Sequence, residues 1–200
     1  MHFCRYLEML QASEGSHPRP LIRGWSPDEI RLVRHLLRRA YRSSGLHGVP
    51  IREYGAILTN QAVGNHAATH IREALASSLP RRVKFCAAPG SGYPDNLLHI
   101  PRRDGDLTIA LEVKATSHWD AKDSNRRVLT SSSRKLRQLF ELPVPHLICT
   151  VIYHRGSGCI EDIRLDFIAP ESEVSVRFEA STSHRLLDTG QHQRSLLFAA

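Results

Sequence analysis

The chain has 200 residues, of which 41% are hydrophobic and 24% charged, a balance that favours a folded domain over a disordered chain. The length suits one domain with a sizeable core. Lysine and arginine outnumber aspartate and glutamate by 27 to 20, which gives a net charge of +7 and an isoelectric point of about 9.6. A small protein this basic commonly binds a polyanion such as nucleic acid, although the charge could serve solubility alone.

Several classes of protein are excluded by the sequence. No stretch approaches the roughly 20 apolar residues of a membrane-spanning helix, and the N-terminal segment carries Glu8 where a signal peptide would be apolar. The chain has neither the glycine-rich phosphate loop of nucleotide-binding proteins nor a Gly-x-Ser-x-Gly motif. We therefore expect a cytoplasmic protein with no membrane segment and no nucleotide cofactor. Its four scattered cysteines are expected to be reduced.

The first third of the chain predicts helices. A short helical start precedes a loose stretch over residues 12–23, and a second helix begins where Ser26 can cap and Pro27 suits the first helical position. Its buried face recurs at helical spacing, and a third helix is predicted over residues 60–79. On another face of the second helix stand Arg31, Arg34, Arg38 and Arg42. That row could contact a phosphate backbone or a partner, or it could be a solvated face.

The rest of the chain predicts mostly strands. Residues 146–153 are nearly all apolar, as expected of a central strand covered on both faces, whereas Ile163, Leu165 and Phe167 alternate with polar residues, as in a half-exposed strand. Further strands are expected over 83–88, 93–100, 107–115 and 174–178, and a short helix over 132–142. This order predicts a single α/β domain with a mixed central β-sheet flanked by helices. Residues 1–59 would form a helical N-terminal part that dimerises or contacts DNA backbone, and residues 60–200 the core.

A β-hairpin is predicted around Asp104 and Gly105, since Asp-Gly is a strong turn signal between two apolar strands. In the second strand, Glu112 and Lys114 share one face, while Leu107, Ile109, Leu111 and Val113 occupy the other. An acid and a lysine therefore stand together on one side of a strand whose other side is core.

The register of this hairpin would bring a second acid to the same place. If Asp104 and Gly105 form a two-residue loop, Asp95 pairs with Lys114 and lies diagonal to Glu112. Neighbours in that relation come within about 5–8 Å. Two carboxylates and one ammonium are thus predicted to converge on one face of the sheet.

This trio has the parts needed for phosphodiester hydrolysis. Two carboxylates separated by the width of one ion form a hard oxygen site that suits Mg²⁺. A metal there can lower the pKa of a bound water and neutralise charge on a phosphate, while the lysine orients the water or stabilises developing charge. The alternative is a cross-strand Asp95–Lys114 ion pair on a solvated face, worth under about 1 kcal/mol.

At these residues the sequence resembles the PD-(D/E)xK nucleases. Tyr93-Pro94-Asp95 is followed by Leu111-Glu112-Val113-Lys114, and sixteen residues separate the two acids, which is ordinary spacing for that family. Two other matches lack the context. Pro27-Asp28 begins a helix, and Asp120-Ala121-Lys122 lies in a polar segment with no strand pattern. The predicted order of elements over about residues 60–155 also resembles the family core.

The resemblance implies a magnesium-dependent nuclease with a restriction-endonuclease-like core. It makes Asp95 and Glu112 metal ligands and Lys114 the residue that orients the water. Family members often add an acid from the preceding helix, for which Glu73 is the candidate, although it could equally be a surface acid. The products would carry 5′-phosphate and 3′-hydroxyl ends.

Within that family, the size and layout look most like a type II restriction endonuclease, which commonly acts as a homodimer on double-stranded DNA at a short palindromic site. The segment 117–137 carries six cations against two acids and follows Lys114 directly. Its predicted DNA-binding residues are Ser117, His118, Lys122, Asn125, Arg126, Arg127, Arg134 and Lys135.

Three other interpretations stay open from the sequence. A DNA repair nickase or a junction resolvase would use the same chemistry, and the motif does not separate them from a restriction enzyme. A catalytically silent DNA-binding module would use Asp95 and Lys114 only as a structural pair. A zinc site at His146, Cys149, His154 and Cys159 is disfavoured, because alternation along the strand puts the two histidines on the face opposite Cys149.

Overall fold

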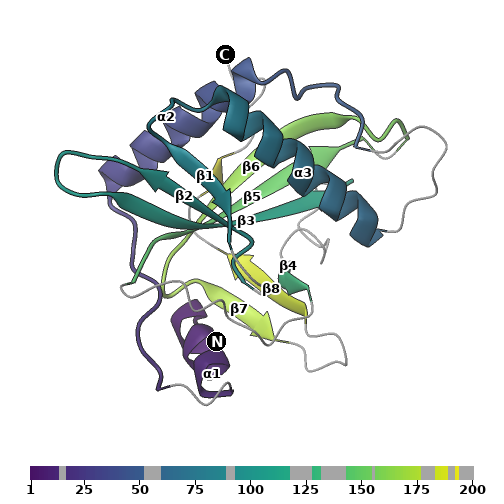
Figure 1. Ribbon diagram of the computed structural model, residues 1–200. Helices are drawn as coiled ribbons and strands as arrows, with labels where there is room; N and C mark the ends of the chain where they lie inside the picture. Colours follow the sequence, from purple (N-terminus) through teal and green to yellow (C-terminus); the bar gives the residue numbers. More distant parts are fainter. Residues whose placement is uncertain are drawn as a thin grey trace.

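A six-stranded mixed sheet forms the centre of the protein (Figure 1). The computed structural model describes residues 1–13, 17–51, 60–88, 93–117, 128–131, 143–154, 156–176, 183–188 and 192–193. The strand order is β1-β2-β3-β5-β6-β9, with β1 Lys84–Ala87, β2 Asn96–Ile100, β3 Leu107–Thr116, β5 His146–Tyr153, β6 Ile160–Ile168 and β9 His192–Gln193. β3 and β5 are parallel and the other neighbours are antiparallel. The expected α/β fold with a mixed sheet is confirmed.

A second, three-stranded sheet has the order β4-β8-β7, from β4 Val128–Ser131, β7 Glu173–Val176 and β8 Ser183–Asp188. Among the described residues there are three helices, α1 Phe3–Ser13, α2 Pro27–Ser43 and α3 Asn60–Ser78. Figure 1 shows α2 and α3 on one side of the main sheet and α1 with the small sheet on the other. No helix within the described ranges has an apolar segment long enough to span a membrane.

Each face of the main sheet has its own core. The side chains of Leu98, Ile109, Leu111 and Val113 pack in one cluster with those of α2 and α3, such as Leu37 and Leu75. The opposite face packs Leu97, Ala110 and Ile148 with α1 residues, such as Phe3 and Tyr6. The helices of the N-terminal part therefore pack directly on the sheet, α2 in the first cluster and α1 in the second.

The β2–β3 hairpin corrects the predicted register by two residues. Asn96 pairs with Leu111 and Ile100 with Leu107, so residues 101–106 form a longer loop than the two-residue turn expected. Extended by one pair, this register puts Asp95 opposite Glu112, where the prediction had Lys114. Because the shift is even, every side chain keeps its face, and the predicted convergence of Asp95, Glu112 and Lys114 on one face survives.

The expectation that residues 163–167 form a half-exposed strand is wrong. Arg164 and Asp166 are both buried, and the Arg164 guanidinium donates from Nε and Nη2 to Asp166 Oδ1 at 3.0 and 2.7 Å. The two charges neutralise each other on the face that the sequence pattern assigns to water.

Other expected elements had mixed outcomes. The helices near residues 27–43 and 60–78 and the strands near 84–87 and 146–153 are confirmed. The short helix expected over 132–142 lies outside the described residues. The separate small sheet was not predicted, since β4 lies within the polar segment interpreted only as a DNA-contact region.

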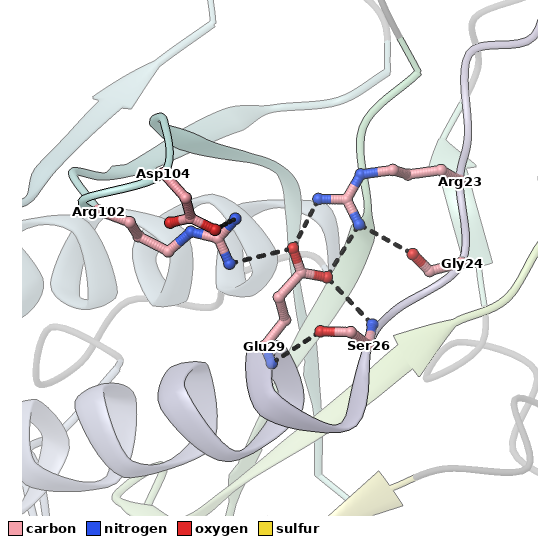
Figure 2. Close-up of polar contacts among 6 residues, drawn as sticks. All are labelled: Arg23, Gly24, Ser26, Glu29, Arg102 and Asp104. Carbon is pink, nitrogen blue, oxygen red and sulfur yellow. Dashed lines mark hydrogen bonds and ion pairs between the residues drawn. The ribbon is translucent and has the colours of Figure 1, made fainter.

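Glu29 joins α2 to the hairpin loop (Figure 2). Ser26 and Glu29 form a capping box, in which the Ser26 hydroxyl accepts from the Glu29 N–H and the Glu29 carboxylate accepts from the Ser26 N–H. Arg23 reaches the same carboxylate with two bonds of 2.8 Å, and Arg102 of the loop contacts it at 3.4 Å. The Glu29 side chain is 5% exposed, and hydrogen bonding from Arg23 is the main reason that its pKa falls to about 2.

We predict that Glu29→Gln destabilises the protein by about 2–3 kcal/mol at pH 7 in urea unfolding, because two arginines lose their buried counter-charge. The ionised carboxylate stabilises the folded state fully above its ordinary pKa of 4.5, and this contribution is lost as the pH falls towards 2. The difference between the two proteins should therefore shrink on acidification. The control is Asp28→Asn, which removes an exposed partner of Arg31 and should change stability by less than about 1 kcal/mol.

Candidate functional site

Asp95, Glu112 and Lys114 meet where β2 begins beside the middle of β3. The Asp95 backbone N–H donates to Glu112 Oε2 at 2.9 Å, and the Lys114 ammonium donates to Glu112 Oε1 at 2.5 Å. The Glu112 side chain is 3% exposed and that of Lys114 is 13% exposed, whereas Asp95 is half-buried. Glu112 is thus the centre of the group, with one oxygen bound to the main chain and the other to an ammonium.

The electrostatics of Glu112 show two carboxylates and one cation acting on one another. Burial raises the pKa of the Glu112 carboxyl to about 7, the Lys114 ammonium acts to lower it, and the negative charge of Asp95 acts to raise it further. Carboxyl groups whose pKa is raised to near 7 are common in active sites, although structural ion pairs also perturb pKa values.

The donor set fits a hard divalent cation. Within the described ranges no group of three or more His, Cys, Asp and Glu side chains is placed to hold a metal. Asp95 and Glu112 supply two carboxylates on facing strands, and Mg²⁺ is usually held by one or two carboxylates together with water and substrate phosphate oxygens. The residues present therefore fit Mg²⁺ better than a fully protein-coordinated metal such as structural zinc.

A buried chain of hydrogen bonds lies directly beneath this group. The Tyr93 hydroxyl contacts His146 Nδ1 at 2.7 Å, and His146 Nε2 contacts the Leu21 carbonyl oxygen at 3.2 Å. Since a carbonyl only accepts, Nε2 carries the proton and Nδ1 accepts from Tyr93. Burial lowers the pKa of His146 to about 4, which keeps the ring neutral. Tyr93 is two residues before Asp95, so the chain that presents Asp95 is anchored to β5.

The structure does not bring the fourth predicted residue, Glu73, to this group. Glu73 is exposed on α3, which packs on the Leu111 and Val113 face of β3, whereas Glu112 and Lys114 stand on the opposite face. We therefore leave Glu73 out of the site. His146 and Cys149 lie on opposite faces of β5, as expected, which separates the residues of the alternative zinc site.

The predicted DNA-binding segment is only partly described. Ser117 is half-buried and follows the last residue of β3, two positions after Ala115. The other candidates lie outside the described residues: His118, Lys122, Asn125, Arg126, Arg127, Arg134 and Lys135.

The arginine side chains of α2 lie in three different environments. Arg31 pairs with Asp28, and Arg34 lies over the Phe167 ring at 5.8 Å. Arg38 and Arg42 line a hollow together with His35, Arg39 and Ser43. α2 covers the sheet face opposite to Glu112, so this basic hollow is separate from the carboxylate group.

Two neighbouring strands add polar residues that the sequence reading did not associate with the site. Thr150 of β5 is the register partner of Lys114, and Arg164 of β6 is the register partner of Thr150. All three belong to the same face of the sheet. The sequence does contain signals for these residues. Thr150 interrupts the apolar segment 147–152, and the charged Arg164 and Asp166 stand inside a predicted strand.

Comparison with known proteins gives no family assignment. No family model matches the chain, and no curated protein matches it. One similar solved structure is the restriction endonuclease BglI bound to its DNA recognition sequence, with 11% identity, a TM-score of 0.43, and coverage of 86% of this chain and 87% of that chain. Another is the tetrameric restriction endonuclease SfiI bound to cognate DNA, with 12% identity, a TM-score of 0.45, and coverage of 84% and 85%. At such values neither likeness carries an argument about this chain's chemistry.

The buried carboxyl of Glu112 predicts a stability that depends on pH. Its folded pKa of about 7 is above the ordinary 4.5, so stability is fully present below about pH 4.5 and falls as the pH rises through 7. Glu112→Gln removes this titration. Urea unfolding from pH 5 to pH 8 should therefore show the wild type losing stability relative to the variant. A constant difference across that range would contradict the buried, coupled environment described for Glu112.

Proposed function

We propose that the protein is a magnesium-dependent nuclease that hydrolyses phosphodiester bonds of double-stranded DNA. The observation that carries this proposal is the convergence of Asp95 and Glu112 with Lys114 on one face of adjacent strands. The net charge of +7 supports a polyanionic substrate. A solvated cross-strand pair of Asp95 and Lys114, the alternative considered from sequence, fits less well because the Lys114 side chain is only 13% exposed and its ammonium bonds Glu112.

Each residue has a role that its surroundings support. Asp95 and Glu112 would hold Mg²⁺, which when bound lowers the pKa of a ligated water and neutralises charge on the phosphate. Lys114 would keep its ammonium directed at the carboxylate group and donate to the attacking water or to a phosphate oxygen. The Asp95 N–H fixes Glu112 Oε2, so the carboxylate plane is set before any ligand arrives.

The finer proposal is a type II restriction endonuclease. Each chain supplies one such group, so a symmetric double-strand cut would require a second copy, and a two-fold dimer would match a palindromic site. Segment 117–137, with its excess of cations, follows Lys114 and would contact DNA beside the cleaved bond. The products would carry 5′-phosphate and 3′-hydroxyl ends.

The test is digestion of supercoiled and linear phage DNA with Mg²⁺. Asp95→Asn, Glu112→Gln and Lys114→Ala should each lower the cleavage rate by about a hundredfold or more, because each removes a metal ligand or the donor to the reacting group. Their affinity for DNA, measured by fluorescence anisotropy without Mg²⁺, should stay within about threefold of the wild type. Asp28→Asn is the matched control, since Pro27-Asp28 is a second Pro-Asp pair that begins a helix on the other side of the sheet.

The products separate the rival functions. Discrete bands support the restriction enzyme, nicked circles alone support a repair nickase, and cleavage confined to four-way junctions supports a resolvase. Tight DNA binding with no cleavage by any divalent metal would instead leave a silent DNA-binding module and refute the nuclease proposal.

A further inference from the structure

A buried hydroxyl lies beside Lys114 with no described partner. Thr150 is 0% exposed, and its Oγ1 makes no hydrogen bond to any residue that the structure describes. A hydroxyl left unpaired in the interior costs about 1–3 kcal/mol, so native proteins seldom keep one without a use. Valine has nearly the same shape and would fill the same space without that cost.

The position of Thr150 limits which group can use it. It is the register partner of Lys114 on the parallel strand β3 and of Arg164 on the antiparallel strand β6, so a cation stands on either side, with backbones about 4.8 Å apart. The guanidinium of Arg164 is directed along its own strand to Asp166, two residues further on. The Lys114 ammonium has three hydrogen-bond donors, and the described residues give it one acceptor, Glu112 Oε1. Lys114 is therefore the neighbour that can donate to Thr150.

Burial decides between two kinds of role. A residue that touches DNA needs an exposed atom, and Thr150 has none, whereas the side chain of Lys114, on the neighbouring strand, is 13% exposed. Thr150 is therefore a buried neighbour of Lys114 on the next strand, and Glu112 bonds the ammonium from two residues away on the same strand. The flexible four-carbon stem of lysine allows its ammonium to reach either neighbour.

We propose that Thr150 is a positioning residue, whose hydroxyl is the second acceptor for the Lys114 ammonium. With Glu112 and Thr150 together, the ammonium is held from two directions and keeps its third donor for the reaction. When a cation engages the Glu112 carboxylate, Thr150 still holds Lys114 in place. This inference rests on the proposed function for its catalytic meaning, but the hydrogen bond that it describes would form in the protein without DNA or metal.

The contact can be tested by proton exchange of the lysine ammonium groups in ¹⁵N-labelled protein without DNA. The chain has only four lysines, Lys84, Lys114, Lys122 and Lys135, so the Lys114 signal can be assigned by substitution. Thr150→Val should speed the exchange of the Lys114 ammonium with water about fivefold, since one acceptor is lost, and Thr150→Ser should restore slow exchange. The control is Thr108→Val, which removes a hydroxyl from the same face of β3, where it bonds the His99 ring.

Cleavage kinetics with Mg²⁺ give the second measurement. Thr150→Val should lower kcat about tenfold with KM unchanged, and Thr150→Ser should restore it, because only the placement of Lys114 changes. Thermal unfolding checks that the variants fold. If Thr150→Val does not fold, Thr150→Ala and Thr150→Ser form an equivalent pair that differs only in the hydroxyl.

The outcomes distinguish this inference from the proposed function. Unchanged Lys114 exchange in Thr150→Val would overturn the inference, whether or not the protein cuts DNA, and would point to Arg164 as the neighbour that uses the hydroxyl. If the wild type fails to cut any DNA, the proposed function fails, and the ammonium exchange alone decides the role of Thr150.

Discussion

The buried carboxylate of Glu112 is the group on which the candidate site depends. A carboxylate deprived of water is costly unless its oxygens are satisfied, and here one oxygen accepts from the Asp95 main chain and the other from Lys114. The first of these bonds fixes where β2 begins relative to β3. The second holds a lysine that would otherwise extend into solvent. The same two contacts thus stabilise the edge of the hairpin and bring the two acids and the lysine together.

The two faces of the main sheet carry different kinds of side chain. The face towards α2 and α3 is mainly apolar around β3, where the buried Asn96 beside Leu111 is a polar exception, and it supplies stability. The other face mixes an apolar cluster near α1 with the charged residues Glu112, Lys114, Arg164 and Asp166. The neutral Tyr93–His146 pair lies at the boundary between the two kinds of environment. Placing polar groups on one face allows a buried, preorganised site without weakening the main core.

Much of this could be predicted from the sequence, because side-chain alternation along a strand is strict. The face shared by Glu112 and Lys114, and the opposite faces of His146 and Cys149, follow from parity alone. The exact register of the β2–β3 hairpin could not be predicted from the sequence. The loop at 101–106 is held by a contact from Arg102 to Glu29, and these two residues are 73 positions apart in the chain. The burial of Arg164 and Asp166 could not be predicted either. Charged residues that alternate with apolar ones in a strand predict a solvent-exposed face, and the sequence does not show that these two pair with each other. The same limit applies to the place of Glu73, because helical spacing does not say which face of the sheet a helix will cover.

Whether Asp95 and Glu112 together form a divalent-cation site can be measured by anomalous diffraction from crystals soaked in Mn²⁺. We expect an anomalous peak within about 2.5 Å of a carboxylate oxygen of each residue. The same soak of Glu112→Gln should lose the peak. A well-ordered site with no peak between the two carboxylates, or a peak bound elsewhere and unchanged in the variant, would contradict it.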